Sequence, residues 1–494
     1  MQLPEFDINI IIVTLLAIPA ICTLIAVIFC RLPLCMNLLI IIISACSPVC
    51  CFYLIQKFLT NGSPLISIKL LDLININIEP IGLIFISMAS FLWVTTNLYS
   101  WSYLNKNPEI NRTKFFFFLS ISLFCTFAIA FSGNLITTFI FYELLTILTY
   151  PLVANVGTDH EKRSAKKYIS ILLLASMTLL LPAILILMQN IGQVDFATGG
   201  IISKVPNTTV ILLFILFLYG VAKTAIVPLH SWLPAAMAAP IPVSALLHAV
   251  AVVKSGIFIM LKVIVYIFGV FNLQKFMTEM FNTNIITILC AASLIISSVI
   301  ALHQKTIKKL LAYSTINQLS ICLLSASMFH PLAIKASILH MVSHAIAKIS
   351  LFFAAGQVYC SSRITKIDDF AGLGKQMKFT MVVFTIAALS IIGIPIFAGF
   401  ISKAYVLFAA LYNKVNYVVI VVLAFSIIIT AHYFIKLICI IYYTKLNSSA
   451  EKILAHQKEE ISSMSVAMFI TCVGIVAYIF IYDHMINLID KIQY

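Results

Sequence analysis

The stretch VILLFILFLYGVAKTAIVPL, residues 210–229, is an apolar run interrupted near its end by one lysine and one proline. About 20 predominantly apolar residues are enough for a helix to cross the hydrocarbon core of a bilayer. Runs of this kind recur from one end of the chain to the other. They are continuous rather than alternating, which predicts membrane-spanning helices and not a β-barrel.

The composition supports the same class of protein. Of 494 residues, 62% are hydrophobic and 10% are charged, whereas soluble domains have about 45–50% apolar and about 25% charged residues. A soluble fold with this composition would lack the polar side chains to cover its surface. The net charge of +14 does not predict nucleic-acid binding, because the basic residues stand singly at the ends of spans or inside them.

We therefore expect an all-α polytopic membrane protein of about 14 transmembrane helices, organised as a single domain over residues 1–494. The loops are short, and no linker rich in proline, serine or glycine separates a soluble domain. The predicted spans are 8–30, 37–56, 80–100, 115–131, 135–154, 168–190, 207–229, 242–266, 284–302, 309–329, 332–360, 379–412 (interrupted), 417–443 and 464–486.

The distribution of Lys and Arg in the loops predicts the orientation. Loops after odd-numbered spans hold 18 basic residues, and loops after even-numbered spans, with the C-terminus, hold 6. By the positive-inside rule, both termini lie on the periplasmic side of a bacterial inner membrane. Residues Met1 to Asp7 contain no Lys or Arg, which argues against a cleaved signal peptide.

Seven lysines lie inside the predicted spans, although each charge at a helix centre costs about 2.5–3.5 kcal/mol. Two of them, Lys262 and Lys335, stand near span ends, where a lysine either snorkels to the interface or has a function. The other five are Lys223, Lys254, Lys348, Lys403 and Lys436. For Lys223, Lys254, Lys348 and Lys403, which lie deeper, we expect a functional role.

One carboxylate lies deep within a predicted span, Glu143 in the fifth. A lone buried carboxylate either binds a proton or pairs with a cation, and Lys223 is the candidate partner. A proton arriving at Glu143 would release Lys223, which could pass its own proton onward, since burial disfavours the charged ammonium. The alternative is a static buried ion pair.

Three titratable residues of the eleventh span, His340, His344 and Lys348, are spaced four apart and share one stripe of a helix. Two histidines at this spacing could bind zinc, but no third ligand is present, so no metal is expected. A hydrated proton relay is the favoured interpretation, and histidines that only pack are the alternative. His248, ahead of Lys254 in the eighth span, is assigned to the same set.

Two spans contain predicted breaks, at Pro228 near Lys223 and at Pro395 ahead of Lys403. Proline removes a helix hydrogen bond, and irregular backbone at membrane depth is tolerated where it is buried in protein or lines a wet cavity. Lys223 and Lys403 are 180 residues apart, and Lys254 and Lys436 are 182 apart. Each interval covers five predicted spans, which indicates a repeat inverted in the membrane.

Several motifs resemble those of the antiporter-like subunits, the family that comprises the proton-pumping membrane subunits of respiratory complex I and the large subunits of Mrp-type Na+/H+ antiporters. The resemblance covers about residues 75–415. The motifs are AKTAIVPLHSWLP (222–234) followed by APIPVSALLHA (239–249), with EPIGL (79–83), YE (142–143), IKKLLAYSTINQ (307–318), HAIAK (344–348) and GFISK (399–403).

The resemblance implies 14 helices with broken seventh and twelfth spans. It also implies two inverted five-helix repeats, spans 4–8 (residues 115–266) and 9–13 (residues 284–443), flanked by spans 1–3 (residues 1–114) and a last span (residues 464–486). The central polar axis of the family is matched by Glu143 in span 5 and Lys223 in span 7. It is further matched by Lys254 with His248 in span 8, by Lys348 in span 11 and by Lys403 in span 12.

Among members of this family, the sequence most resembles the D-type large subunit of the Mrp antiporters, because of Lys254 and because Lys403 stands where one complex I subunit has a glutamate. Ala235 and Ala238 depart from the family pattern, in which many members carry acids there. We expect a membrane subunit of a multisubunit Na+/H+ antiporter, which exchanges H+ for Na+ or another monovalent cation. Other membrane subunits of the assembly are its expected partners.

The alternative is a proton-pumping subunit of complex I or of a membrane-bound hydrogenase, and an unrelated solute permease is a third possibility. The chain has no cofactor motif, so we expect no cofactor and no redox centre in this polypeptide under either of the first two hypotheses.

Overall fold

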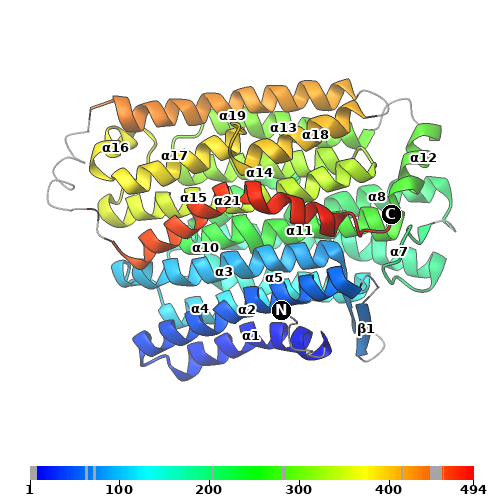
Figure 1. Cartoon of the computed structure of the whole chain (residues 1–494), viewed down its shortest axis with the longest axis horizontal. Coiled ribbons are helices and arrows are strands. Elements are labelled where there is room, and N and C mark those ends of the chain that lie inside the picture. Colours follow the sequence, from blue (N-terminus) through cyan, green and yellow to red (C-terminus); the bar gives the residue numbers. More distant parts are fainter. Residues whose placement is uncertain are drawn as a thin grey trace.

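The computed structural model describes residues 8–61, 65–70, 74–202, 205–280, 285–412, 416–445, 459 and 461–494. Residues 1–7 and four of the loop lysines used above for the orientation, Lys204, Lys414, Lys452 and Lys458, lie outside these ranges. Long helices lie side by side through most of the described chain (Figure 1).

The helices fall into three groups by length and geometry. The longer α-helices are α1 (Ile8–Ile28), α2 (Pro33–Asn61), α3 (Pro80–Lys106), α4 (Arg112–Ala130), α5 (Leu135–Val153), α6 (Asp159–Ala175), α7 (Leu181–Ile191), α8 (Asn207–Gly220), α11 (Val252–Lys262), α12 (Val270–Met280), α13 (Ile285–Leu302), α14 (Ile307–Ala326), α15 (Pro331–Ser362), α17 (Lys378–Ile392), α18 (Ala398–Leu411), α19 (Tyr417–Tyr443) and α21 (Ser463–Ile489). Short α-helices are α9 (Trp232–Ala235), α10 (Ile241–Leu246) and α16 (Leu373–Gln376). Segments of π- or 3₁₀-helix are η1 (Ser176–Leu180), η3 (Ala222–Thr224), η4 (Leu229–Ser231), η5 (Ala236–Ala238), η6 (Leu247–Ala251), η7 (Val263–Phe268) and η8 (Asp368–Phe370).

The prediction of a helical, multi-pass membrane protein is confirmed. Within the described residues, 11 helices are long and apolar enough to cross a membrane. Two of these join several elements, α6–η1–α7 and α10–η6–α11–η7, into continuous rods. Every predicted span overlaps helix in the structure, but α14 and the helices beside the two breaks are not among the 11. The count of 14 therefore stays a prediction.

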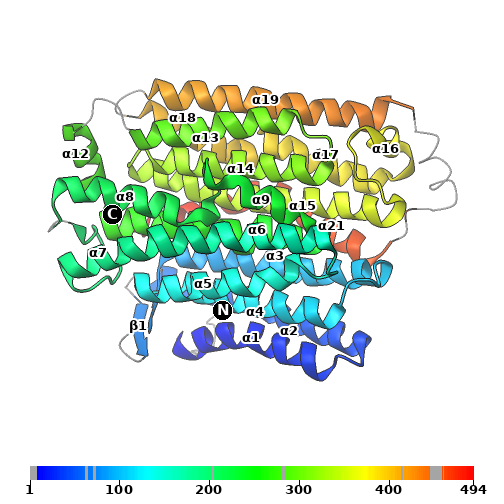
Figure 2. The same cartoon turned by 180° about the vertical axis from the view of Figure 1, so that it is seen from behind.

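Two long helical segments are the most deeply buried of the candidate membrane spans. The rod from Ile241 to Phe268 and helix α15 are each buried over the whole of their most apolar window. By contrast, α2 buries only 28% of its window. Helices α1 and α2 lie at one edge of the molecule and α19 at the opposite edge, while α21 crosses one face (Figure 1) and α6 the other (Figure 2).

A β-hairpin, which was not predicted from the sequence, precedes α3. Strands β1 (Leu65–Leu70) and β2 (Ile74–Ile78) pair antiparallel, and the backbone of β2 also bonds the corner between α4 and α5, from the Asn77 amide to the Phe131 oxygen at 2.7 Å. The alternation ININI in β2 is the strand signal that the helical interpretation passed over. The hairpin fixes the chain at the entrance to α3 and so positions Glu79.

Both predicted breaks are present, which confirms broken seventh and twelfth spans. Helix α8 ends at Gly220, and four short helical turns lead to α10. Helix α17 ends at Ile392, and α18 begins at Ala398 after Gly393 with φ 94°. In each case the chain turns within the bundle, which leaves helix-end carbonyl groups that need partners inside the protein.

Candidate functional site

Glu143 lies on α5, whose first turn is capped by the Asn134 side chain. The residue is only 7% exposed, and its two carboxylate oxygens have no hydrogen-bond partner in the described part of the chain. The neighbouring Ser176 hydroxyl donates to the carbonyl oxygen of Leu172 at 3.0 Å instead. A buried carboxylate in this situation is stable only when a proton, a cation or water reaches it.

Lys223 lies in η3, directly after the end of α8, and is fully buried. Its Nζ donates to the carbonyl oxygen of Tyr142 at 2.6 Å and lies 3.6 Å from the centre of the Tyr142 ring. The Lys223 and Glu143 charges act on each other, but within the described residues they form no direct ion pair. Lys223 is thus bound to Tyr142, the residue directly before its predicted partner Glu143.

The first break is pinned by close packing. The indole N–H of Trp232 donates to the Ala222 oxygen at 2.9 Å, and Gly256 of α11 packs directly on the turn. A Cβ at Gly256 would lie 2.6 Å from the Lys223 carbonyl carbon. Lys223 therefore packs against α11 at Gly256, which is two residues after Lys254 on that helix.

Lys254 and His344 form a direct contact between the two central rods. The Nζ of Lys254 on α11 lies 2.6 Å from the Nδ1 of His344 on α15. Lys254 is fully buried and His344 is 2% exposed. Two titratable groups at hydrogen-bond distance can exchange a proton, because either nitrogen can carry it while the other accepts.

His340, one turn earlier on α15, reaches the second broken span. Its Nδ1 lies 2.9 Å from the hydroxyl of Ser402 on α18, and Ser343 donates to the same hydroxyl at 3.0 Å. The His340 and His344 rings are nearly parallel, with centroids 6.3 Å apart. The predicted stripe therefore faces inward, and it joins Lys254 on one side to α18 on the other.

Lys348 and His248 are buried without hydrogen-bond partners in the part of the chain that the structure describes. Lys348 continues the α15 stripe. His248 lies on η6, a stretch of π-helix of the kind often found at functional sites, and its ring packs on Phe352 at 5.4 Å. The two side chains are close enough for their charges to interact.

Lys403 occupies the second break and is 5% exposed. Its Nζ donates to the carbonyl oxygens of Ile391 at 2.6 Å and Ile392 at 2.9 Å. These are among the last carbonyl groups of α17, which have no partner within their own helix. The ammonium also lies at the negative end of the helix dipole, so the break and the lysine stabilise each other.

One buried ion pair was not predicted from the sequence. Lys262 was expected to snorkel or to act near a span end, but it is fully buried, and its Nζ lies 3.0 Å from an Oε of Glu79. EPIGL (79–83) was noted as a motif, but Glu79 was given no role because it precedes Pro80 and lies just before a span. The alternating stretch ININI (74–78) directly before it is the sequence signal that could have indicated an ordered strand there. The snorkelling interpretation of Lys262 is wrong, since a carboxylate keeps the ammonium inside.

Two other span lysines behave differently from the deep set. Lys335 pairs with Asp490 near the C-terminus at 2.5 Å, and its side chain is 18% exposed. Lys436 is exposed on the outer side of α19. The offset between Lys254 and Lys436 therefore does not relate two buried lysines.

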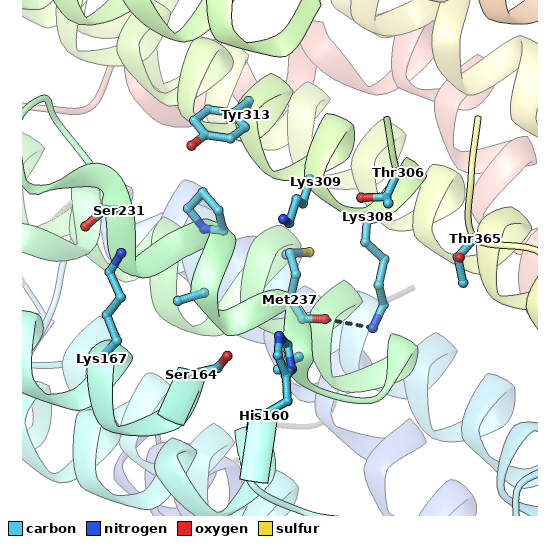
Figure 3. A pocket seen from close by; sticks show the side chains of 13 residues that line it. His160, Ser164, Lys167, Ser231, Met237, Thr306, Lys308, Lys309, Tyr313 and Thr365 are labelled. Carbon is cyan, nitrogen blue, oxygen red and sulfur yellow. Dashed lines mark hydrogen bonds between the residues drawn. The ribbon is translucent and has the colours of Figure 1, made fainter. Parts of the chain in front are cut away.

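A cavity of about 420 Å³ lies between α6, α9 and α14 (Figure 3), and none of the buried relay candidates lines it. Four basic side chains surround it, and one of them, Lys308, donates to the Met237 oxygen at 2.9 Å. The others are His160, Lys167 and Lys309. A positive lining repels cations, so we do not assign cation entry to this cavity.

The fold and the buried polar side chains define a multi-pass helical membrane protein with a charged interior. Residues 132–430, more than half of the chain, match the family described as NADH:quinone oxidoreductase/Mrp antiporter, transmembrane. The chain belongs to this family, as its motifs predicted. The match begins at the α4–α5 corner and ends within α19, and so it includes every predicted relay residue.

Similar proteins include both kinds of assembly. The N subunit of NADH-quinone oxidoreductase from Desulforudis audaxviator is 29% identical over 374 residues, covering 74% of this chain and 72% of that protein. A Staphylococcus aureus protein named as antiporter subunit mnhA2 is 27% identical over 70% of this chain. The match spans only 44% of that longer protein. Neither is named as a D-type antiporter protein, so that assignment stays a prediction.

Two solved structures share the fold. One chain of an archaeal membrane-bound sulfane sulfur reductase superposes with a TM-score of 0.84 at 23% identity, covering 97% of this chain and 96% of that chain. One chain of the Mrp complex from Dietzia superposes with a TM-score of 0.81 at 19% identity and the same coverage. The arrangement of helices is therefore that of subunits found in multisubunit membrane complexes.

Proposed function

We propose that this chain translocates protons and monovalent cations as a membrane subunit of a multisubunit Na+/H+ antiporter. The observation that carries the proposal is the series of buried charged side chains, Glu143, Lys223, Lys254, Lys348 and Lys403, in the interior of the bundle. Charges at this depth are costly, and in membrane proteins they mark ion and proton pathways. The relative named as an antiporter subunit supports antiport as the form of transport.

The contacts suggest an order of events. When Glu143 takes a proton, Lys223 loses the negative charge beside it and can release its own proton toward Lys254. Lys254 hands a proton to His344 across their 2.6 Å contact. His340 then connects the stripe to Ser402, one residue from Lys403 at the second break.

Water completes this pathway. Several buried nitrogens along it have no protein partner among the described residues, and an orphaned buried polar atom is costly unless water satisfies it. A chain of waters touching these atoms would carry protons between groups that are not in direct contact. The atoms are both ring nitrogens of His248, the Nε2 atoms of His340 and His344, and the Nζ of Lys348.

A second candidate function is redox-driven proton pumping in a complex I-like or hydrogenase-like assembly. It is favoured by the relative from NADH-quinone oxidoreductase, which is matched over more of its own length than the antiporter relative. The same relay would serve in that case, with the driving energy supplied by other subunits. Partner subunits are part of both candidates.

We place the chain in a bacterial inner membrane with both termini on the periplasmic side, from the bias of basic residues between the loops. A fusion of alkaline phosphatase to Tyr494 tests this topology. High phosphatase activity in intact cells is expected, because the enzyme folds actively only after export. If the phosphatase fusion is inactive and a green fluorescent protein fused at the same position is fluorescent, the C-terminus lies on the cytoplasmic side and the proposed orientation is wrong.

The decisive experiment is to purify the intact complex through a tag on this chain, identify its subunits and reconstitute it in vesicles with a pH-sensitive dye inside. A Na+ pulse, with choline as the control ion, is expected to move protons. Glu143→Gln should abolish that response. Glu161→Gln should leave it intact, because Glu161 is a half-buried carboxylate that caps the start of α6 and glutamine can make the same capping hydrogen bonds. Co-purified redox subunits with no response to Na+ would favour the second candidate.

A further inference from the structure

The groups around the Lys262 ammonium, Glu79 among them, have the geometry of a cation-binding site. The cation in that site is the ammonium of the protein's own lysine. The Lys262 ammonium lies 3.0 Å from the Glu79 carboxylate and donates to the Ser132 carbonyl oxygen. It also lies 4.1 Å from the centre of the Phe196 ring and 5.6 Å from that of Phe258. Carboxylate, carbonyl and aromatic faces all attract a positive charge, and together they surround this one.

The carboxylate is not required to hold the local fold. Glu79 is the residue before the first turn of α3, but its side chain makes no capping hydrogen bond to that helix. Its neighbours are already fixed by backbone contacts, since β2 bonds to the α4–α5 corner through Asn77 and through the Gly133 amide, which donates to the Asn75 oxygen at 2.7 Å. The negative charge is therefore not needed for a helix cap and can serve to bind a cation, which at present is the Lys262 ammonium.

A cavity of about 390 Å³ is lined by Glu79 but not by Lys262. Glu79 and Tyr266 line its inner part, and Asp490 and Lys491 of the C-terminal segment also line it. The Asp490 side chain is 53% exposed, whereas Glu79 is 7% exposed. The cavity thus runs from solvent to the buried carboxylate, and it is large enough for a hydrated ion.

This cavity lies at the end of the helices that holds the C-terminal segment and β1 (Figure 1). That end is the predicted outer face, because the bias of basic residues between the loops places the C-terminus outside. Lys262 ends the same helix, α11, that carries Lys254, eight residues earlier. At a rise of 1.5 Å per residue the two are about 12 Å apart along the axis.

We propose that Glu79 is an outer-face binding site for a small monovalent cation, which displaces the Lys262 ammonium from the carboxylate. This inference rests on the proposed function and adds a point where ions are exchanged with the outside. A cation arriving through the cavity competes with Lys262 for the same oxygens of Glu79 and Ser132. Binding releases the ammonium, and the altered charge at the end of α11 acts on Lys254 along the rod.

The competition makes opposite predictions for the two members of the pair. Glu79→Gln removes the ligand and should raise the Na+ concentration for half-maximal transport by at least about tenfold, which corresponds to about 1.4 kcal/mol. Lys262→Gln removes the tethered competitor and should lower that concentration. The matched control is Glu109→Gln, a partly exposed carboxylate that pairs with Arg363 and does not line this cavity, and it should change the value less than twofold.

The measurement uses the intact complex in vesicles of known orientation, with the initial rate of dye response recorded against external Na+. Binding of ²²Na+ to the purified complex is measured in parallel, so that a variant with lost transport still gives a result. Equal half-saturation in Glu79→Gln, Lys262→Gln and the unaltered chain would overturn the inference and leave a structural ion pair. The proposed function fails separately, if the unaltered complex moves no protons at all.

Discussion

The two broken spans use the same device and differ in what holds the lysine. At each break a buried lysine donates to backbone carbonyl oxygens. Lys223 bonds a carbonyl of a neighbouring helix beside Glu143, whereas Lys403 bonds the end of the first half of its own span. The first lysine can be switched by protonating a carboxylate, and the second is held by fixed dipoles. In the proposed relay, Lys223 is therefore the controlled entry and Lys403 the fixed terminus.

The sharpest test of this contrast is Lys223→Ala. We expect ion-coupled transport to fall about 100-fold, because alanine leaves no group at the first break that can take up and release a proton, and a positioned proton-transfer group is worth about 100-fold or more. The complex should still assemble, since Trp232 and Gly256 hold the turn without the lysine side chain. Na+-driven dye response and native gel electrophoresis give the two readouts. Transport above half of the normal rate would contradict a switching role.

The second break should respond differently to Lys403→Met. Loss of the ammonium leaves two carbonyl groups unpaired, at about 1–3 kcal/mol each, so we expect a lower melting temperature of the purified complex and about tenfold slower transport. Lys403→Arg keeps the donors and should recover the melting temperature. A normal melting temperature for Lys403→Met would show that the carbonyl groups at the end of α17 do not need the Lys403 ammonium.

The link between the breaks is tested by His344→Gln. Glutamine can still accept from Lys254 but cannot carry a proton onward, so transport should fall severalfold to about tenfold with little change in stability. A solvent-isotope comparison in D₂O checks the assignment, because a proton-transfer role predicts a changed isotope effect. Unaltered transport would leave His344 as a packing residue.

A smaller effect is expected from Tyr142→Phe. The change keeps the carbonyl and the ring that hold the Lys223 ammonium, and removes only the hydroxyl that accepts from the Lys223 amide at 3.3 Å. A single hydrogen bond is worth about 0.5–1.5 kcal/mol, so the loss of transport should stay below about tenfold. A complete loss would mean that the hydroxyl itself belongs to the relay.

The smallest effects should come from Lys335→Ala and Lys436→Ala. The first lysine is partly exposed and pairs with Asp490, and the second is exposed on α19. Substitutions at such positions usually change stability by no more than about 0.5 kcal/mol. Transport within twofold of normal is expected from both variants. Abolished transport in either would place a further charge on the pathway.

Hydropathy and charge were sufficient to predict helices, breaks and the depth of the main lysines. Lys223, Lys254, Lys348 and Lys403 are all at most 5% exposed. Periodicity alone cannot tell which face of a helix meets lipid, and so the repeat offset matched the buried Lys254 with Lys436, which is exposed. The contacts of His340 with Ser402 and of Lys254 with His344 join residues 62 and 90 positions apart, which no local pattern encodes.

The pair of Glu79 and Lys262 was missed for a related reason. A carboxylate just before a proline reads as the start of a helix near the interface, and only the tertiary placement of the hairpin buries it. The sequence carried a strand signal in ININI (74–78). A period of two was overlooked because the surrounding chain is so strongly helical.

One packing feature constrains how the protein can work. A Cβ on Gly399 would lie 1.8 Å from the carbonyl oxygen of Ser390 at the second break. Gly256 makes a similarly close backbone contact with Lys223 at the first break. At both breaks the nearest atoms to the glycine are backbone atoms of the neighbouring segment. Movement of one half-helix against its neighbour would have to separate these close backbone contacts. This packing favours the proposed relay, in which ammonium groups rotate and protons move along water, over movement of the half-helices.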